Sequence, residues 1–369
     1  MAWRVILVAA LLAVNACASV LHEGPASQER RWTDYMGSSR RASDATDTLA
    51  TDPEPIWRTD IGRGVVGAPA LTEDLVVLAQ VDRQLTVLDR RTGAIIWRRR
   101  FGENIGSGPL VDYDRVFFAT QTDRGQVVAL DLRTGKQRWG TRLGDVAAPL
   151  AIHDAQVYAG TVDGWFVALS TAGGERLWRT QLSGAVRAAP VVVAGGVIAA
   201  TGADSLYLLD RAAGAIRARR ATDGTVLAAP ALADSVLLFG TSGGRVEACD
   251  TATLARRWSL DVGSEVIGAI AVRRDTAFVL THDGDLWRVP LDAPAHASRV
   301  ALGIVGRGGP TPVAGGVLVA SVAGQLALVD GTGTKRWIAQ VKPPVVQPVI
   351  VDGRFFVAVS ERGEVVAFR

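Results

Sequence analysis

The sequence is poor in the residues that build most catalytic and metal centres. Its 369 residues include 2 Cys, 4 His and 2 Asn. Two cysteines cannot form a disulfide-rich scaffold or a cysteine-based zinc site. No charge sign dominates either, with 40 Lys and Arg against 37 Asp and Glu, and this balance argues against a strongly basic nucleic-acid binder. The 21% of charged residues is typical of soluble proteins and excludes a disordered chain.

The first residues also lack an apolar run that is long enough to cross a bilayer as a helix. The run from Val5 to Val14 carries no charge, but it falls well short of the roughly 20 residues that a membrane span needs. Arg4 precedes this run, and small residues and then Cys17 follow it, which is the order of a secretory signal. We therefore expect an exported protein.

The end of this segment, Val14-Asn15-Ala16-Cys17, resembles a bacterial lipobox, in which the cysteine is diacylated and becomes the first mature residue. Asn15 departs from the small residue usual at its position. Ala18 after the cysteine favours the outer membrane. We expect residues 1–16 to be a lipoprotein signal peptide and Cys17 to carry the lipid, with soluble secretion or a periplasmic location as the alternative.

Residues 17–54 are polar and show little periodicity. Such a segment cannot bury enough apolar surface to offset the entropy lost on ordering. We expect a flexible tether with a mean reach of roughly 30 Å. It would join the lipid to a folded body over residues 55–369.

The body repeats itself with a period of about 40 residues. A small residue followed by proline marks one point of the period, and tryptophan marks a second. The proline series is Pro69, Pro109, Pro149, Pro190, Pro230, Pro310 and the degenerate Pro348, with Gly268-Ala269 in the missing place. The tryptophan series is Trp57, Trp97, Trp139, Trp178, Trp258 and Trp337. Two independent markers in one period indicate a repeat architecture.

Each period is typical of four short strands. Between Pro109 and Thr141, apolar and β-branched runs of about five residues alternate with turns rich in Asp and Gly. Such runs joined by such turns predict antiparallel hairpins. Four strands in about 40 residues are the pattern of a propeller blade, and helix-containing repeats do not fit. The fold class is therefore all-β.

The count predicts eight blades that close through the two chain ends. The last unit ends with three strands and lacks its tryptophan strand, whereas Ile56 to Thr59 forms an unpaired tryptophan strand before the first proline. Pairing of the N-terminal strand with Val365 to Phe368 would complete the eighth blade. Closure removes the free sheet edges that otherwise promote aggregation.

The unit from Ala129 to Trp139, with the pattern Ala-x-Asp-x-x-x-Gly-x-x-x-Trp, resembles the repeat of the PQQ-type β-propeller superfamily. It recurs from Asp89 to Trp97 and, more weakly, in three later units. The resemblance implies that each motif tryptophan packs between neighbouring blades, against the Ala and Gly of the motif. We therefore regard the six tryptophans as structural.

Lipobox, polar tether and a single eight-bladed propeller together resemble the BamB family, lipoproteins of the outer-membrane β-barrel assembly machinery. This resemblance implies a non-enzymatic scaffold whose loops contact periplasmic domains of the barrel-assembly protein, BamA. An apolar-Arg pair before an inner strand contributes to that contact in the family, and Val186-Arg187 matches it here. Further candidates, in or near loops, are Arg63, Trp165, Trp287 and Arg307.

The PQQ-type superfamily also contains quinoprotein dehydrogenases, which bind a quinone and calcium in the channel. Those enzymes commonly carry a disulfide of adjacent cysteines, whereas Cys249 stands alone at an apolar repeat position, as a buried core residue would. The recurrent turn aspartates, such as Asp89 and Asp131, are explained by backbone hydrogen bonding. We expect no cofactor, metal or catalytic residue. The alternative function is an exported propeller that binds a small molecule, a glycan or another envelope protein in its channel.

Overall fold

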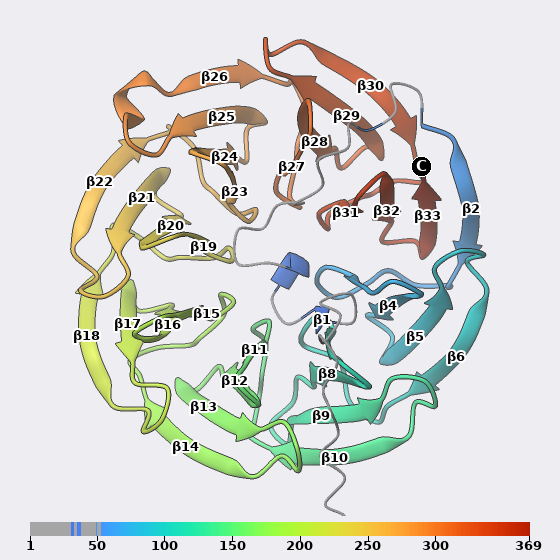
Figure 1. Cartoon of the computed structure of the whole chain (residues 1–369), viewed down its shortest axis with the longest axis vertical. Coiled ribbons are helices and arrows are strands. Elements are labelled where there is room, and N and C mark those ends of the chain that lie inside the picture. Colours follow the sequence, from blue (N-terminus) through green and yellow to red (C-terminus); the bar gives the residue numbers. More distant parts are fainter. Residues whose placement is uncertain (1–30, 33–34, 38–48, 50–52) are drawn as a thin grey trace, which may run out of the picture.

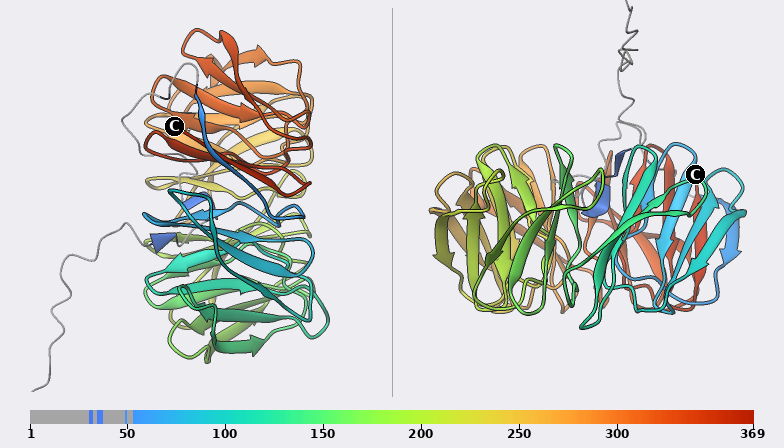
Figure 2. Two further views of the ribbon diagram at one scale, coloured as in Figure 1. Left: turned by 90° about the vertical axis from the view of Figure 1, so that its right-hand side faces the viewer. Right: turned by 90° about the horizontal axis from the view of Figure 1, so that it is seen from below.

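In the computed structural model, eight β-sheets surround a central axis as the blades of a propeller (Figure 1). The structure describes residues 31–32, 35–37, 49 and 53–369. Seen from the side, the blades form a disc with loops on two faces (Figure 2). The expected all-β fold of eight four-stranded antiparallel blades is confirmed.

Within blades 1 to 7 the four blade strands run from the channel outwards in chain order. Blades 1 to 3 contain β3 (Ala70–Leu71), β4 (Leu75–Ala79), β5 (Gln84–Asp89) and β6 (Ile95–Arg100); β7 (Leu110–Asp112), β8 (Arg115–Ala119), β9 (Gln126–Asp131) and β10 (Gln137–Arg142); β11 (Ala151–His153), β12 (Gln156–Gly160), β13 (Trp165–Ser170) and β14 (Arg176–Gln181). Blades 4 and 5 contain β15 (Val191–Val193), β16 (Gly196–Thr201), β17 (Ser205–Leu209) and β18 (Ile216–Ala221); β19 (Ala231–Ala233), β20 (Val236–Gly240), β21 (Arg245–Asp250) and β22 (Arg256–Asp261). Blades 6 and 7 contain β23 (Ala271–Arg273), β24 (Thr276–Leu280), β25 (Asp285–Pro290) and β26 (Ser298–Ala301); β27 (Thr311–Val313), β28 (Gly316–Ala320), β29 (Gln325–Asp330) and β30 (Lys335–Gln340).

Blade 8 joins the two ends of the body, as expected. It contains β31 (Ile350–Asp352), β32 (Phe355–Val359) and β33 (Glu364–Phe368), and its outermost strand is β2 (Pro55–Asp60). β2 and β33 are antiparallel, with Thr59 opposite Val365 and Asp60 opposite Glu364. In Figure 1 the blue β2 lies beside the red β33. The ring of blades is thereby complete.

Helical structure is limited to two single-turn 3₁₀ segments, η2 (Tyr35–Gly37) and η3 (Pro294–His296), in the described part of the chain. η3 takes the place of the Asp-Gly turn in blade 6. None of the described helices has the length and apolar character that crossing a membrane would require.

The core lies between successive blades, where apolar side chains of one sheet meet those of the next. Between blades 2 and 3, for example, Leu110 and Phe117 pack in one cluster with Leu150 and Ile152. Because each sheet buries both faces in this way, its two middle strands are buried almost throughout. The result is a rigid disc that carries its loops at fixed positions.

Five of the six motif tryptophans join one blade to the next. Each donates its indole N–H to a backbone carbonyl of the following blade; the pairs are Trp57 to Arg90, Trp97 to Leu132, Trp139 to Thr171, Trp178 to Arg211 and Trp258 to Leu291. The donor–acceptor distances are 2.7 to 2.9 Å. The motif glycine of the following blade lies under the ring in the first four pairs. The packing implied by the repeat motif is present, but the glycine belongs to the neighbouring blade.

Trp337 differs from the other five, because its side chain is 41% exposed. The reason is the register of β30. Trp337 lies opposite Ala327, which packs with blade 6, whereas Trp139 lies opposite Ala129, which packs with the following blade. The next residue, Ile338, is buried towards blade 8 in its place.

Part of the segment 17–54 packs against the propeller, although the sequence predicted a flexible tether there. β1 (Arg31–Trp32) pairs with β7 and makes blade 2 five-stranded. Met36 is buried and packs in one cluster with the channel residues Ala68 and Ala229. Leu49 is buried with residues of blades 7 and 8. The signal peptide and Cys17 lie outside the described residues.

Candidate functional site

The loops that precede the inner strands build one mouth of the channel. In each loop a backbone carbonyl accepts a hydrogen bond from the neighbouring hairpin, as in Gly202 N to Ala185 O at 2.7 Å and Val322 N to Val305 O at 2.8 Å. In most of these loops the residue with this carbonyl is followed by a buried Val or Ile. The second residue after the carbonyl then faces the channel. We call these eight channel-facing residues the mouth ring: Val66, Gly106, Ala147, Arg187, Leu227, Ile267, Arg307 and Val346.

The mouth ring opens into a pocket of about 290 Å³. Its walls are mainly glycine, alanine and backbone from the start of the inner strands, and Tyr35 contributes to it from the N-terminal segment. Small residues are required because the loops crowd together there: a Cβ on Gly268 would lie 2.7 Å from the backbone nitrogen of Gly309. The pocket is thus rigid, and its chemistry depends on a few longer side chains.

Two arginines dominate the electrostatics of this pocket. Arg187 and Arg307 are both exposed and both line it, and neither side chain makes a hydrogen bond or ion pair with a described residue. No Asp or Glu lines the pocket in the described part of the chain. Guanidinium groups recognise carboxylate and phosphate through paired N–H donors. The mouth can therefore attract and hold an anionic group.

Exposed apolar side chains lie beside the arginines. Leu227 belongs to the mouth ring and is 42% exposed, and Val305, two residues before Arg307, is 48% exposed. Val81 is exposed on the same face, where its N–H bonds to the Gly64 carbonyl of a mouth loop. Apolar residues mixed with arginine are typical of the central part of a protein–protein interface.

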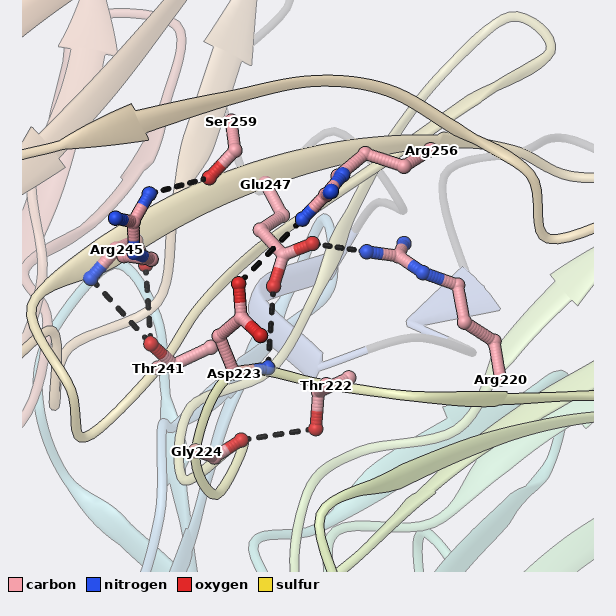
Figure 3. A network of polar contacts seen from close by, with 9 residues as sticks. All are labelled: Arg220, Thr222, Asp223, Gly224, Thr241, Arg245, Glu247, Arg256 and Ser259. Atoms are coloured by element: carbon pink, nitrogen blue, oxygen red, sulfur yellow. Dashed lines mark hydrogen bonds and ion pairs between the residues drawn. The ribbon is translucent and has the colours of Figure 1, made fainter.

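A buried ion pair holds the loop that carries Leu227. Glu247 of β21 is fully buried and accepts a hydrogen bond from Arg220 of β18 (Figure 3). The other carboxylate oxygen of Glu247 lies 3.4 Å from the backbone nitrogen of Asp223. Arg220 belongs to blade 4 and lies just before the loop, whereas Glu247 belongs to blade 5. The pair therefore ties the beginning of the loop to blade 5.

The carboxylate of Asp223 lies 3.4 Å from Nη1 of Arg256 (Figure 3). Thr222 donates to the Gly224 carbonyl at 2.9 Å and tightens the same turn. The loop's one acidic side chain is therefore engaged by Arg256 and does not line the pocket.

The structure separates the two residues of the predicted contact pair. Val186 is fully buried, bridges to Thr201 and packs closely against Gly160, so it supports the loop from inside. The alternation in the loop places Val186 inwards and Arg187 at the mouth. The contribution of the pair to a partner contact stays a prediction, with Arg187 as its exposed member.

The further candidates divide in the same way. Arg307 lies at the mouth with Arg187, whereas Arg63 is exposed on a mouth loop but does not line the pocket. Trp165 is half-buried beneath Arg179, whose guanidinium lies 4.4 Å from the ring centre, and Trp287 packs against the core of blades 5 and 6. Sequence reasoning missed Leu227, although it has the same offset from its proline as Arg187, and nothing in the pattern indicated Tyr35.

The channel does not fit the calcium–quinone site of the PQQ-type enzymes. That site needs Glu, Asn and Asp ligands, and the lining residues include none of these while contributing two cations. No cluster of three or more His, Cys, Asp or Glu in the described ranges could hold a metal ion. Cys249 is buried, as expected, and its burial raises the pKa of the thiol to about 11.

Comparison with known proteins identifies the family. A family model described as "Outer membrane protein assembly factor BamB" matches residues 42–164, 85–192, 121–253 and 163–292, which together cover more than half of the chain. The chain belongs to the BamB family.

Curated BamB proteins are similar to parts of the chain. The protein from Burkholderia pseudomallei is 28% identical over 130 residues, 34% of this chain and 33% of that protein. The protein from Yersinia pestis is 26% identical over 247 residues, 61% of this chain and 60% of that protein. The matches thus span between a third and three fifths of these BamB proteins.

Solved structures share the fold. BamB from Moraxella catarrhalis has a TM-score of 0.73 at 19% identity, with 86% of this chain and 97% of that chain covered. The computationally designed Ika8 protein has a TM-score of 0.71 at 14% identity, with 84% and 97% covered. The second match shows that the propeller alone does not define a function.

Proposed function

We propose that the protein is a non-enzymatic assembly factor for outer-membrane β-barrel proteins, anchored by a lipid on Cys17. It binds periplasmic domains of the barrel-assembly protein, BamA, through the mouth loops, with Arg187 as a central contact. The observation that carries this proposal is the mouth itself, where two unpaired arginines and exposed Leu227 and Val305 stand on a rigid disc. Membership of the BamB family supports it.

The path of the N-terminal segment supports an orientation in which the mouth faces away from the membrane. Arg31 pairs with Asp112 at the end of β7 that is remote from the mouth, and Trp32 pairs with Val111. The chain then continues to Tyr35 at the pocket. Cys17 precedes Arg31 by 14 residues, which span at most about 50 Å. A lipid on Cys17 would hold the far face towards the bilayer and leave the mouth open to a partner.

Affinity purification from detergent-solubilised envelopes tests this function. We expect the tagged full-length chain to recover the barrel-assembly protein and to fractionate with the outer membrane. Cys17→Ser should release the chain into the soluble periplasmic fraction, since the substitution removes the thiol that carries the lipid. Repeated absence of the barrel-assembly protein from the purified wild-type chain would contradict the proposed function.

The pocket also favours a second function, capture of a small anionic ligand by an exported propeller. Its volume of about 290 Å³ is near the lower limit of small-molecule sites, and its arginines converge on one space. In that case a small anion should bind saturably to the purified chain while no envelope protein is recovered with it.

A further inference from the structure

Arg187 and Arg307 occupy the same position in two different repeats. Each is the channel-facing residue of its loop, three residues before the proline that begins the inner strand, Pro190 or Pro310. The loops precede blades 4 and 7, so the two side chains enter the pocket from separated sectors of the ring. Every other member of the mouth ring is glycine or apolar.

The two positive charges share one rigid pocket and lack a partner in the described residues. Of the acidic side chains in and beside the loop that carries Leu227, Asp223 is engaged by Arg256 and Glu247 by Arg220. An inserted anion would therefore meet two free guanidinium groups held by a backbone that does not need to rearrange. Preorganisation of this kind lowers the cost of binding.

The surroundings of the pocket indicate what kind of anion fits. Leu227 follows Arg187 in the ring and Val305 precedes Arg307, so each arginine has an exposed apolar neighbour on the mouth face. A free phosphate would leave these apolar side chains exposed to water. A peptide loop with acidic residues next to apolar ones would cover them while its carboxylates enter the pocket.

We propose that Arg187 and Arg307 form a two-armed clamp for an acidic loop of a partner protein, inserted into the mouth of the channel. The proposal rests on the proposed function, because it names the chemistry of the segment that the mouth loops bind. Arg187 alone would give a rim contact, whereas the second arginine makes the channel itself part of the interface.

Selection of cyclic peptides on the folded full-length chain tests the clamp without the assembly machinery. Random disulfide-cyclised heptapeptides are selected on the wild-type chain and counter-selected on the double variant Arg187→Gln/Arg307→Gln. Both arginines are exposed and unpaired with described residues, so we expect this variant to fold and to melt like the wild type. The recovered peptides should carry Asp or Glu beside apolar residues.

Affinities are then measured for a recovered peptide and for its amide analogue, in which Gln or Asn replaces the acidic residues. The comparison separates the contribution of the carboxylates from that of the apolar contacts. The acidic peptide should lose about tenfold in affinity for each single variant, Arg187→Gln and Arg307→Gln, because each removes one charge-assisted contact. Arg63→Gln, a matched control on the same face outside the pocket, should change the affinity less than about twofold. Affinity should fall as the salt concentration rises.

Three outcomes would overturn the clamp: recovered peptides without acidic residues, no peptide recovered at all, or equal affinity for the wild type and the Arg307→Gln variant. Saturable binding of inorganic phosphate, or binding to phosphatidylglycerol vesicles that the double variant loses, would assign the mouth to a small anion or a lipid instead. The peptide selection and the envelope purification are independent experiments. Failure of the clamp in the selection would not contradict the assembly role, and failure to recover the barrel-assembly protein would not contradict the clamp.

Discussion

At the scale of single residues, the contact between a motif glycine and the tryptophan of the preceding blade explains the repeat pattern. Gly174 has a φ of +78°, and a Cβ there would lie 2.5 Å from Cε3 of Trp139. Its carbonyl also accepts a hydrogen bond from Thr141 at 2.6 Å. The residues of the motif therefore form contacts between blades as well as a turn within one blade.

Gly174→Ala should lower the free energy of unfolding by more than Gly263→Ala does. Gly263 has a nearly equal φ of +76°, and a Cβ there meets nothing within 4 Å. Both variants acquire the backbone strain of about 1 kcal/mol, and only Gly174→Ala adds an overlap with the indole, which costs a further 1–3 kcal/mol or so. Urea denaturation measures both. Equal losses of unfolding free energy in the two variants would show that the indole of Trp139 can move aside.

The sequence indicates the partners of five tryptophans and also carries a signal that Trp337 differs. Seven positions separate Asp330 from Trp337, against eight between Asp131 and Trp139, and the shorter turn places Trp337 on the other face of its strand. The burial of Val186 could not be predicted, since an apolar residue beside an arginine can lie on either side of a loop. Packing against the neighbouring strands decides such orientations.

At the scale of the element, the turn between the third and fourth strands is held by its aspartate. Asp131 accepts hydrogen bonds at 2.8 Å from the backbone nitrogen and the hydroxyl of Thr134, and Arg138 donates to its other oxygen. These bonds, chiefly that from the Thr134 hydroxyl, lower the pKa of Asp131 to about 2. Arg257 and the turn N–H groups lower the pKa of Asp250 to about 2 in the same way.

The lowered pKa values predict a loss of stability in acid. A carboxyl whose pKa is lower in the folded state contributes stability that is present above its unfolded pKa, near 4, and is lost as the pH falls through the folded value. We expect the wild type to exceed Asp131→Asn in stability by about 1 kcal/mol at pH 7. This difference should shrink between pH 4 and pH 2 in denaturation experiments. A difference that does not vary with pH would contradict the assigned role.

The strands themselves follow closely from the sequence. In blade 2 the runs of about five residues expected between Pro109 and Thr141 correspond to strands such as β8 and β9, of five and six residues. Local turn chemistry sets these boundaries, which is why they could be predicted. β1 could not, because two residues in a polar segment show no periodicity and their pairing with β7 depends on a distant channel edge.

At the scale of the whole molecule, stability depends on the pairing of β2 with β33. This pairing supplies the outer strand of blade 8 and covers an edge that would otherwise stay open. The number of blades and their closure could be predicted from the period and the unpaired strand at each end. The pocket and its two arginines required the structure, because the two loops lie 120 residues apart in the sequence.

A chain that begins at residue 61 should fold poorly, since it lacks β2. We expect aggregation or a markedly lower melting temperature, because the edge of β33 becomes available for pairing between molecules. A chain that begins at residue 53 retains β2 and serves as the control. Size-exclusion chromatography and thermal unfolding compare the two. A soluble, monomeric chain from residue 61 with an unchanged melting temperature would show that the other seven blades suffice.

The contact between blades 7 and 8 includes a side chain from outside the propeller. Ile338 faces blade 8, and Leu49, from the segment before the propeller, is buried with Ile338 and Phe368. β1 and Met36 attach the same segment to the channel. A pulling force on the N-terminal segment would therefore act first on β1 and Met36, and only then on the contact between blades 7 and 8.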